Sequence, residues 1–133
     1  PVAAPPAPPR APRPRAQDKT VLVVDDEEMV REVLCNMLED LGYRALGADG
    51  GDQALALADG DTAIDAAIVD LTMPGMSGRV VLDGLRTRRP SLPVILASGY
   101  DRDRAAVPRS AGFLRKPFRF ETLEQLLQDV LGV

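Results

Sequence analysis

Five short apolar runs divide the sequence. The runs at 20–24, 64–69 and 94–97 are continuous and rich in aliphatic residues, which is typical of strands that are covered on both faces of a parallel sheet. The runs at 43–48 and 112–115 are weaker or shorter. The sequence therefore predicts five strands, and it places the second of them near an edge of the sheet.

Helical patterns separate these runs. Apolar residues recur every three or four positions, which predicts helices over 30–41, 52–58, 79–88, 102–107 and 120–131. Gly42 is expected to end the first helix in a left-handed conformation, Ser77 is an expected N-cap, and Pro108 limits the fourth helix. Strands that alternate with helices predict right-handed crossovers and a doubly wound α/β fold, with a parallel sheet between two helical layers.

The first 17 residues differ in composition from the rest. They hold seven of the twelve prolines, three arginines and no acidic residue. We expect residues 1–17 to form an extended, flexible linker, with a proline-motif ligand for a partner as the alternative, and residues 18–133 to form one domain. Because the sequence starts at Pro1 and not at Met, we also expect it to be a fragment of a longer protein.

Composition excludes several classes of function. With three of the sixteen basic residues in the linker, residues 18–133 keep 13 basic against 20 acidic side chains, which is a poor match for nucleic acid. The absence of histidine removes Ser-His-Asp and Cys-His catalysis and most zinc sites. Any metal would therefore be held by oxygen, as Mg²⁺, Mn²⁺ and Ca²⁺ are. Cys35 is the one cysteine; we interpret it as a small helix residue in a protein from a reducing compartment. No apolar run approaches the roughly 18 residues of a membrane span.

Polar residues gather at the expected carboxyl ends of the strands. Asp25 and Asp26 follow the first strand, Asp70 the third, Ser98 the fourth and Lys116 the fifth. If the strand order is 2-1-3-4-5, the first and third strands are neighbours, and the three carboxylates lie close together. A divalent cation and the ammonium of Lys116 would relieve their repulsion. Such an arrangement suits phosphoryl transfer, which needs positioning and charge neutralisation more than acid–base chemistry.

Four stretches carry a family resemblance. They are VLVVDDE at 21–27, DLTMPGMSG at 70–78, LASGY at 96–100 and GFLRKPF at 112–118. In this order and spacing, residues 18–131 resemble the receiver domain of bacterial two-component signalling proteins. The resemblance implies a flavodoxin-like (βα)5 fold with the strand order 2-1-3-4-5. From Ser98 to Phe113 the chain is roughly one helical turn shorter than is usual for the family, so we expect a short fourth helix.

The resemblance also implies roles for the residues at the strand ends. Asp70 would accept a phosphoryl group from a histidine, and Lys116 would pair with that group and with Asp70. Asp26 and Asp70 would bind Mg²⁺, or alternatively Mn²⁺, directly, and Asp25 would act mainly through a water. The backbone carbonyl of Thr72 would be a further metal ligand.

Two further positions match the conformational switch of the family. Ser98 matches the hydroxyl that moves toward the phosphoryl oxygen, and Phe113 matches the aromatic switch position. By the same resemblance, the Lys116–Pro117 peptide bond is expected to be cis.

The resemblance implies a partner as well. Because the sequence has no histidine, the donor would be a histidine kinase or a histidine phosphotransfer domain, in the same polypeptide or in another protein. The stretches at 96–100 and 112–118, together with the proline-rich linker, most resemble receivers at the C-terminus of bacterial hybrid histidine kinases. We expect a cytoplasmic domain without membrane or nucleic-acid contacts, in a parent protein that could itself be anchored in a membrane.

Two alternatives stay open at this point. The first is a stand-alone or truncated response regulator, which would catalyse its own phosphorylation and dephosphorylation in the same way. The second is an aspartyl-phosphate hydrolase resembling the haloacid-dehalogenase-like phosphatases. That family has an Asp-x-Asp motif after its first strand, whereas this chain has the adjacent pair Asp25 and Asp26.

Overall fold

The computed structural model describes residues 19–73, 75–99 and 111–132. The strands in these ranges are β1 (Thr20–Val24), β2 (Arg44–Ala48), β3 (Ala66–Asp70), β4 (Val94–Ser98) and β5 (Gly112–Arg115). The helices are α1 (Glu28–Asp40), α2 (Gly51–Asp59), α3 (Gly78–Arg88) and α5 (Phe120–Leu131). The five predicted strands are therefore confirmed, and the four predicted helices that fall within the described ranges are confirmed with them.

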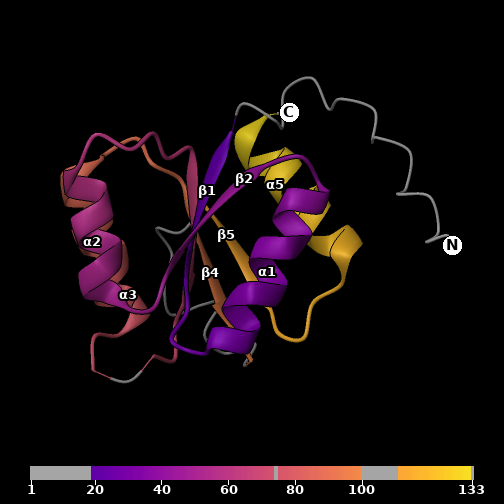
Figure 1. Cartoon of the computed structure of the whole chain (residues 1–133), viewed down its shortest axis with the longest axis horizontal. Coiled ribbons are helices and arrows are strands. Elements are labelled where there is room, and N and C mark those ends of the chain that lie inside the picture. The colour runs from indigo at the N-terminus through magenta and orange to yellow at the C-terminus, as the bar shows by residue number, and fades with distance from the viewer. Residues whose placement is uncertain (1–18, 74, 100–110, 133) are drawn as a thin grey trace, which may run out of the picture.

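The strands form one parallel sheet in the order β2-β1-β3-β4-β5. Helices α1 and α5 cover one face of the sheet, and α2 and α3 cover the other (Figure 1). This is the doubly wound, flavodoxin-like α/β arrangement that was predicted, with β2 at an edge of the sheet. In such a sheet the carboxyl ends of all strands lie along the same side, here called the carboxyl edge, and ligands bind there.

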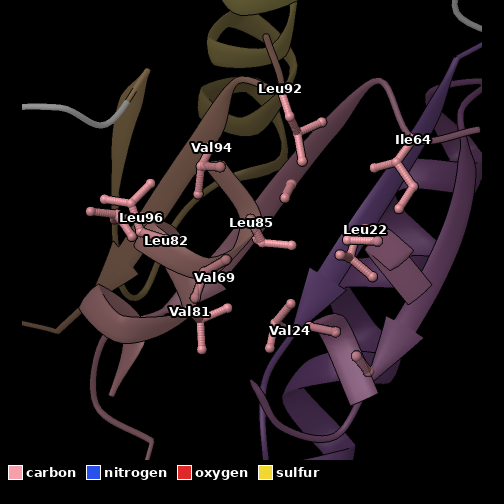
Figure 2. Packing of buried hydrophobic residues seen from close by; sticks show 14 of the residues in the cluster. Leu22, Val24, Ile64, Val69, Val81, Leu82, Leu85, Leu92, Val94 and Leu96 are labelled. Carbon is pink, nitrogen blue, oxygen red and sulfur yellow. The ribbon is translucent and has the colours of Figure 1, made fainter. Parts of the chain in front are cut away.

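Each central strand sends alternate side chains into two apolar layers. Leu22 and Val24 of β1 join the layer beneath α2 and α3, whereas Val21 and Val23 join the layer beneath α1 and α5. Figure 2 shows part of the first layer, where Val81, Leu82 and Leu85 of α3 lie close to Val69, Val94 and Leu96 of the sheet. All residues of β1, β3 and β4 are buried, which explains why these strands are continuous apolar runs in the sequence.

Three local predictions are confirmed. Gly42, just beyond α1, has a φ of 97°, the left-handed conformation expected at the end of a helix. Ser77 caps α3, because its hydroxyl accepts the backbone N–H of Val80 at 3.4 Å. The Lys116–Pro117 peptide bond is cis.

Strand β3 begins at Ala66, two residues later than predicted. The carboxylate of Asp65 accepts the backbone N–H of Thr20 at 2.7 Å. The backbone N–H of Asp65 donates in turn to the carbonyl of Thr20 at 2.8 Å. Asp65 thus contacts Thr20 through both its backbone and its side chain, and the pairing of the two strands begins with Ala66 and Val21. The strand also includes Asp70 as its last residue, so the aspartate is anchored by the sheet itself.

Cys35 lies on α1, half-buried at the margin of the layer beneath α1 and α5. Burial raises the pKa of its thiol, and the nearby carboxylate of Glu39 raises it further. A thiol with a raised pKa holds little of the reactive thiolate at neutral pH, which fits the interpretation of Cys35 as a packing residue.

Two predicted segments, the linker at 1–17 and the short helix at 102–107, lie outside the described residues. Within the ranges that are described, no helix combines the length and the apolar character needed to span a membrane.

Candidate functional site

Three carboxylates meet at the carboxyl edge of the sheet. Val24 of β1 pairs with Val69 of β3, so the residues that follow them, Asp25 and Asp70, lie next to each other. Together with Asp26, each offers one oxygen, and these oxygens all lie within 4.8 Å of one another. Asp25 and Asp70 are only 3% and 4% exposed, whereas Asp26 is exposed. The structure thus brings together the three aspartates that the sequence predicted to be close.

Every polar atom of Asp25 has a partner. Its backbone N–H donates to the carbonyl of Ala48 at 3.1 Å, and its own carbonyl accepts from the guanidinium of Arg31 at 2.7 Å. Its carboxylate accepts the backbone N–H of Glu27 at 2.9 Å and the ammonium of Lys116 at 3.1 Å. These bonds fix both the main chain and the side chain of Asp25, and they offset the cost of burying its charge.

Asp70 is held by Thr72, two residues further along the chain. Thr72 donates to Oδ1 of Asp70 from its backbone N–H at 3.0 Å and from its hydroxyl at 2.9 Å. The other oxygen, Oδ2, lies 3.5 Å from Nζ of Lys116. The hydroxyl contact was not predicted. The Asp-x-Thr spacing signals the backbone contact, because an Asp side chain in a turn typically accepts the backbone N–H two residues on.

Lys116 serves both buried aspartates. Its backbone N–H donates to the carbonyl of Ser98 at 2.8 Å, which ties the residue after β5 to the end of β4. Its Nζ lies 3.1 Å from Asp25 and 3.5 Å from Asp70. The pairing with Asp70 is confirmed, whereas the closer pairing with Asp25 was not predicted.

The charges of this pocket suit a divalent cation. Three carboxylates and one ammonium leave two negative charges within a few ångströms. A set of donors made only of oxygen fits a hard cation such as Mg²⁺ and does not suit zinc. Asp26 lies on the side of the pocket that is open to solvent, from which such an ion would enter.

The two predicted switch positions lie on neighbouring strands. Ser98 is the last residue of β4 and is fully buried. Phe113 of β5 pairs with Leu96 of β4 and packs, half-buried, against the layer beneath α2 and α3. The structure thus places Ser98 at the carboxyl ends of the strands, with the three aspartates, while Phe113 lies nearer the amino end of its strand, level with Leu96.

A glycine brings α3 against Asp70. Gly78 is the first residue of α3, and a Cβ at this position would lie 2.6 Å from the carbonyl oxygen of Asp70 and 2.7 Å from Cα of Leu71. Atoms do not approach each other so closely, so no other residue fits here without a shift of the backbone. Gly78 was not predicted as a site residue, although it lies in a stretch that carries the family resemblance.

Comparison with models of protein families matches residues 21–128 to the response regulator receiver domain. The chain belongs to this family. Receiver domains act in two-component signalling, where they interact with histidine kinases or phosphotransfer domains. Membership of this family leaves the resemblance to haloacid-dehalogenase-like phosphatases without support.

Relatives of this receiver domain include proteins of different kinds. It is 36% identical over 119 residues to the probable transcriptional regulatory protein TcrX of Mycobacterium tuberculosis, covering 86% of this chain and 50% of TcrX. It is 35% identical over 119 residues to the sensor kinase CckA of Brucella abortus, covering 84% of this chain and 12% of CckA. The receiver domain thus spans half or less of the length of these curated relatives.

The fold is shared with a solved structure that contains metal. The response regulator TrrA from Thermotoga maritima, in complex with Mg²⁺-BeF, superposes with a TM-score of 0.78 at 32% sequence identity. The match covers 85% of this chain and 99% of that chain.

Millimolar Mg²⁺ is expected to raise the melting temperature of this receiver domain. Folding brings the three carboxylates together, so a cation that binds them stabilises the folded state alone. At about ten times its dissociation constant, the ion would add about 1.4 kcal/mol to the free energy of unfolding, or roughly 5 °C. Thermal melts in EDTA and in Mg²⁺, at matched ionic strength, measure the shift.

Two aspartate variants sharpen this measurement. Asp26→Ala removes a predicted ligand and should lose most of the shift. Asp59→Ala removes an exposed carboxylate that pairs with Arg88 at 2.8 Å, and it should keep the full shift. A melting temperature that does not respond to Mg²⁺ in the unaltered protein would contradict the cation site.

Proposed function

We propose that Asp70 accepts a phosphoryl group from a histidine in a His-Asp phosphorelay, with Mg²⁺ as the cofactor. The observation that carries this proposal is the buried carboxylate of Asp70, which faces Lys116 and shares its pocket with Asp25 and Asp26. A nucleophile, a fixed cation and an oxygen donor set at one edge of the sheet are what phosphoryl transfer requires.

In this transfer, Oδ2 of Asp70 attacks the phosphorus of a phosphohistidine. An O–P bond forms while the N–P bond breaks, and the electron pair of the N–P bond returns to the imidazole nitrogen. Oδ1 accepts the two hydrogen bonds from Thr72, which orient the carboxylate with Oδ2 toward Lys116. Lys116, already 3.5 Å from Oδ2, offsets the negative charge of the phosphoryl oxygens.

Asp26 and Asp70 would hold Mg²⁺ directly, with the backbone carbonyl of Thr72 as a further ligand. Both carboxylate oxygens of Asp25 already accept hydrogen bonds, from Glu27 and Lys116, which suits the proposed contact through a water. When bound, the ion neutralises charge on the carboxylates and on the phosphoryl group. The complex of the related TrrA with Mg²⁺-BeF supports this choice of ion.

Ser98 and Phe113 carry the proposed switch. The hydroxyl of Ser98, at the end of β4, would donate to a phosphoryl oxygen on Asp70. Phe113 pairs with Leu96 of β4. A displacement of the end of β4 would therefore also move the aromatic ring of Phe113.

The donor histidine must come from outside these 133 residues, because they contain none. We propose that residues 18–133 are the receiver domain of a hybrid sensor histidine kinase and that residues 1–17 link it to the preceding part. The similarity to the sensor kinase CckA supports this assignment. The similarity to TcrX supports the alternative, a response regulator; the reading frame around this sequence distinguishes them, because only the hybrid encodes a kinase domain before Pro1.

Phosphorylation in vitro tests the proposed chemistry. Incubation with acetyl phosphate and Mg²⁺, or with a phosphorylated histidine kinase, should add one phosphoryl group to the protein, and EDTA should suppress the reaction. Intact-mass measurement counts the groups, and borohydride reduction followed by peptide mapping locates the acyl phosphate. Absence of the label, or its location on a residue other than Asp70, would show that the proposal is wrong.

A further inference from the structure

We propose that Arg31 and Gly47 form a positioning pair that holds Asp25 in place for cation binding. Asp25 is almost fully buried, and its carbonyl accepts a hydrogen bond of 2.7 Å from Nη1 of Arg31. The inference rests on the proposed function, because it concerns the affinity of the same acidic pocket for Mg²⁺. It assigns a role to two residues that are not expected to touch the ion.

The side chain of Arg31 reaches Asp25 by crossing the edge strand of the sheet. Arg31 lies on α1, and a Cβ on Gly47 of β2 would lie 3.3 Å from its Cδ, 3.5 Å from its Cγ and 3.6 Å from its Nε. The bare backbone of Gly47 is therefore the surface on which the stem of Arg31 rests. A side chain at this position would push the stem away, and with it the guanidinium.

Strand β2 supports Asp25 in two ways. The carbonyl of Ala48, next to Gly47, accepts the backbone N–H of Asp25 at 3.1 Å. The guanidinium that rests on Gly47 binds the carbonyl of the same residue. Both polar groups of the Asp25 backbone are thus fixed, so its carboxylate is aimed into the pocket before any ion arrives. Contacts of this kind, which orient a ligand group without touching the metal, typically change metal affinity about 10–100-fold.

The charge of Arg31 makes it possible to distinguish a positioning role from a purely electrostatic one. If Arg31 acted only through its charge, it would repel Mg²⁺, and its removal would tighten Mg²⁺ binding. If Arg31 acts by positioning, its removal frees the backbone of Asp25 and weakens binding. The two roles therefore predict changes of opposite direction in the dissociation constant.

Mg²⁺ titration of the full chain, followed by backbone amide chemical shifts, measures this constant without any phosphorylation. Arg31→Met keeps an apolar stem over Gly47 but removes the donor and the charge, and it should raise the dissociation constant about tenfold. Arg31→Lys keeps a donor and the charge and should fall between Arg31→Met and the unaltered protein.

Arg89 provides a matched control away from the acidic pocket, after the C-terminal end of α3 and before β4. Its guanidinium also donates to backbone carbonyls, those of Ala58 and Gly60, both at 3.0 Å. Arg89→Met should leave the dissociation constant for Mg²⁺ unchanged, even where it lowers the melting temperature.

Gly47→Val tests the other half of the pair. Valine is favoured in strands, and Gly47 is exposed on the edge strand. This preference offsets the loss of the hydrogen bond to Asp25, so the variant should melt close to the temperature of the unaltered protein in EDTA. It should nevertheless bind Mg²⁺ several-fold more weakly, a combination that a purely structural role would not produce.

The outcomes separate the two proposals. If the unaltered protein binds Mg²⁺ and Arg31→Met binds it equally well or more tightly, the positioning role is wrong and the proposed function stands. If the unaltered protein does not bind Mg²⁺, the cation site of the proposed function is wrong, and the role of Arg31 is overturned with it.

Discussion

Asp70→Asn is expected to abolish phosphorylation of this receiver domain, with labelling reduced by more than about 100-fold. The carboxamide has the size of the carboxylate, and its oxygen can keep the two hydrogen bonds from Thr72. It is neutral, however, and therefore a very poor nucleophile toward phosphorus. Labelling with acetyl phosphate and with a phosphorylated histidine kinase, both followed by intact mass, measures the loss.

The same variant is expected to be more stable than the unaltered protein in EDTA. Removing one of three carboxylates whose oxygens lie within 4.8 Å relieves repulsion in the folded state, worth on the order of 1 kcal/mol. Lys116 keeps its closer partner, Asp25, at 3.1 Å. Mg²⁺ should in turn stabilise Asp70→Asn less than it stabilises the unaltered protein. The difference in stability between the two proteins should therefore become smaller as the ion is added.

Asp59→Asn is the matched control for this substitution. Asp59 is the last residue of α2 and pairs with Arg88, away from the pocket. Its substitution by Asn removes one negative charge, as Asp70→Asn does. It should be labelled at the level of the unaltered protein. Labelling of Asp70→Asn at that level would instead show that Asp70 is not the acceptor.

Much of this fold could be predicted because each element carries its own local signal. Strands β1, β3 and β4 are buried along their whole length, so they stand out as apolar runs whatever surrounds them. The stripe of α5, which buries Leu123 and Leu127, stands out in the same way. Given a parallel sheet with the strand order 2-1-3-4-5 that the family resemblance implied, the meeting of Asp25 and Asp70 then follows, since neighbouring parallel strands bring their carboxyl ends together.

Several side-chain contacts between different elements could not be predicted. An arginine one turn into α1 has the pattern of a solvated helix face, and only the fold reveals that Gly47 leaves room for it to reach Asp25. Similarly, the choice of Lys116 between two carboxylates depends on differences of a few tenths of an ångström. The late start of β3 depends on where the side chain of Asp65 meets the first strand. Such details are decided by side-chain directions in three dimensions, which a pattern along one chain does not contain.

Gly78→Ala is expected to destabilise the protein by about 2–3 kcal/mol. The added Cβ would lie 2.6 Å from the carbonyl oxygen of Asp70 and 2.7 Å from Cα of Leu71. Both are backbone atoms at the end of a central strand, so they cannot rotate away as a flexible side chain would. Either α3 or the end of β3 must shift, and a shift of β3 would move Asp70 itself. Urea unfolding measures the loss of stability, and Mg²⁺ titration and phosphorylation measure the displacement of the acceptor.

Gly60→Ala is the control that isolates the steric cause. Gly60, at the end of α2, has a φ of −84°, and its Cβ would meet no atom closer than 3.6 Å. Alanine there restricts the unfolded chain and should leave stability unchanged or raise it by up to about 1 kcal/mol. If both substitutions destabilised the protein equally, close approach to Asp70 would not be the reason for the glycine at position 78. If Gly78→Ala lost stability but kept its affinity for Mg²⁺ and its phosphorylation, the strain would be taken up by α3, and the acceptor would be held by the sheet and Thr72 alone.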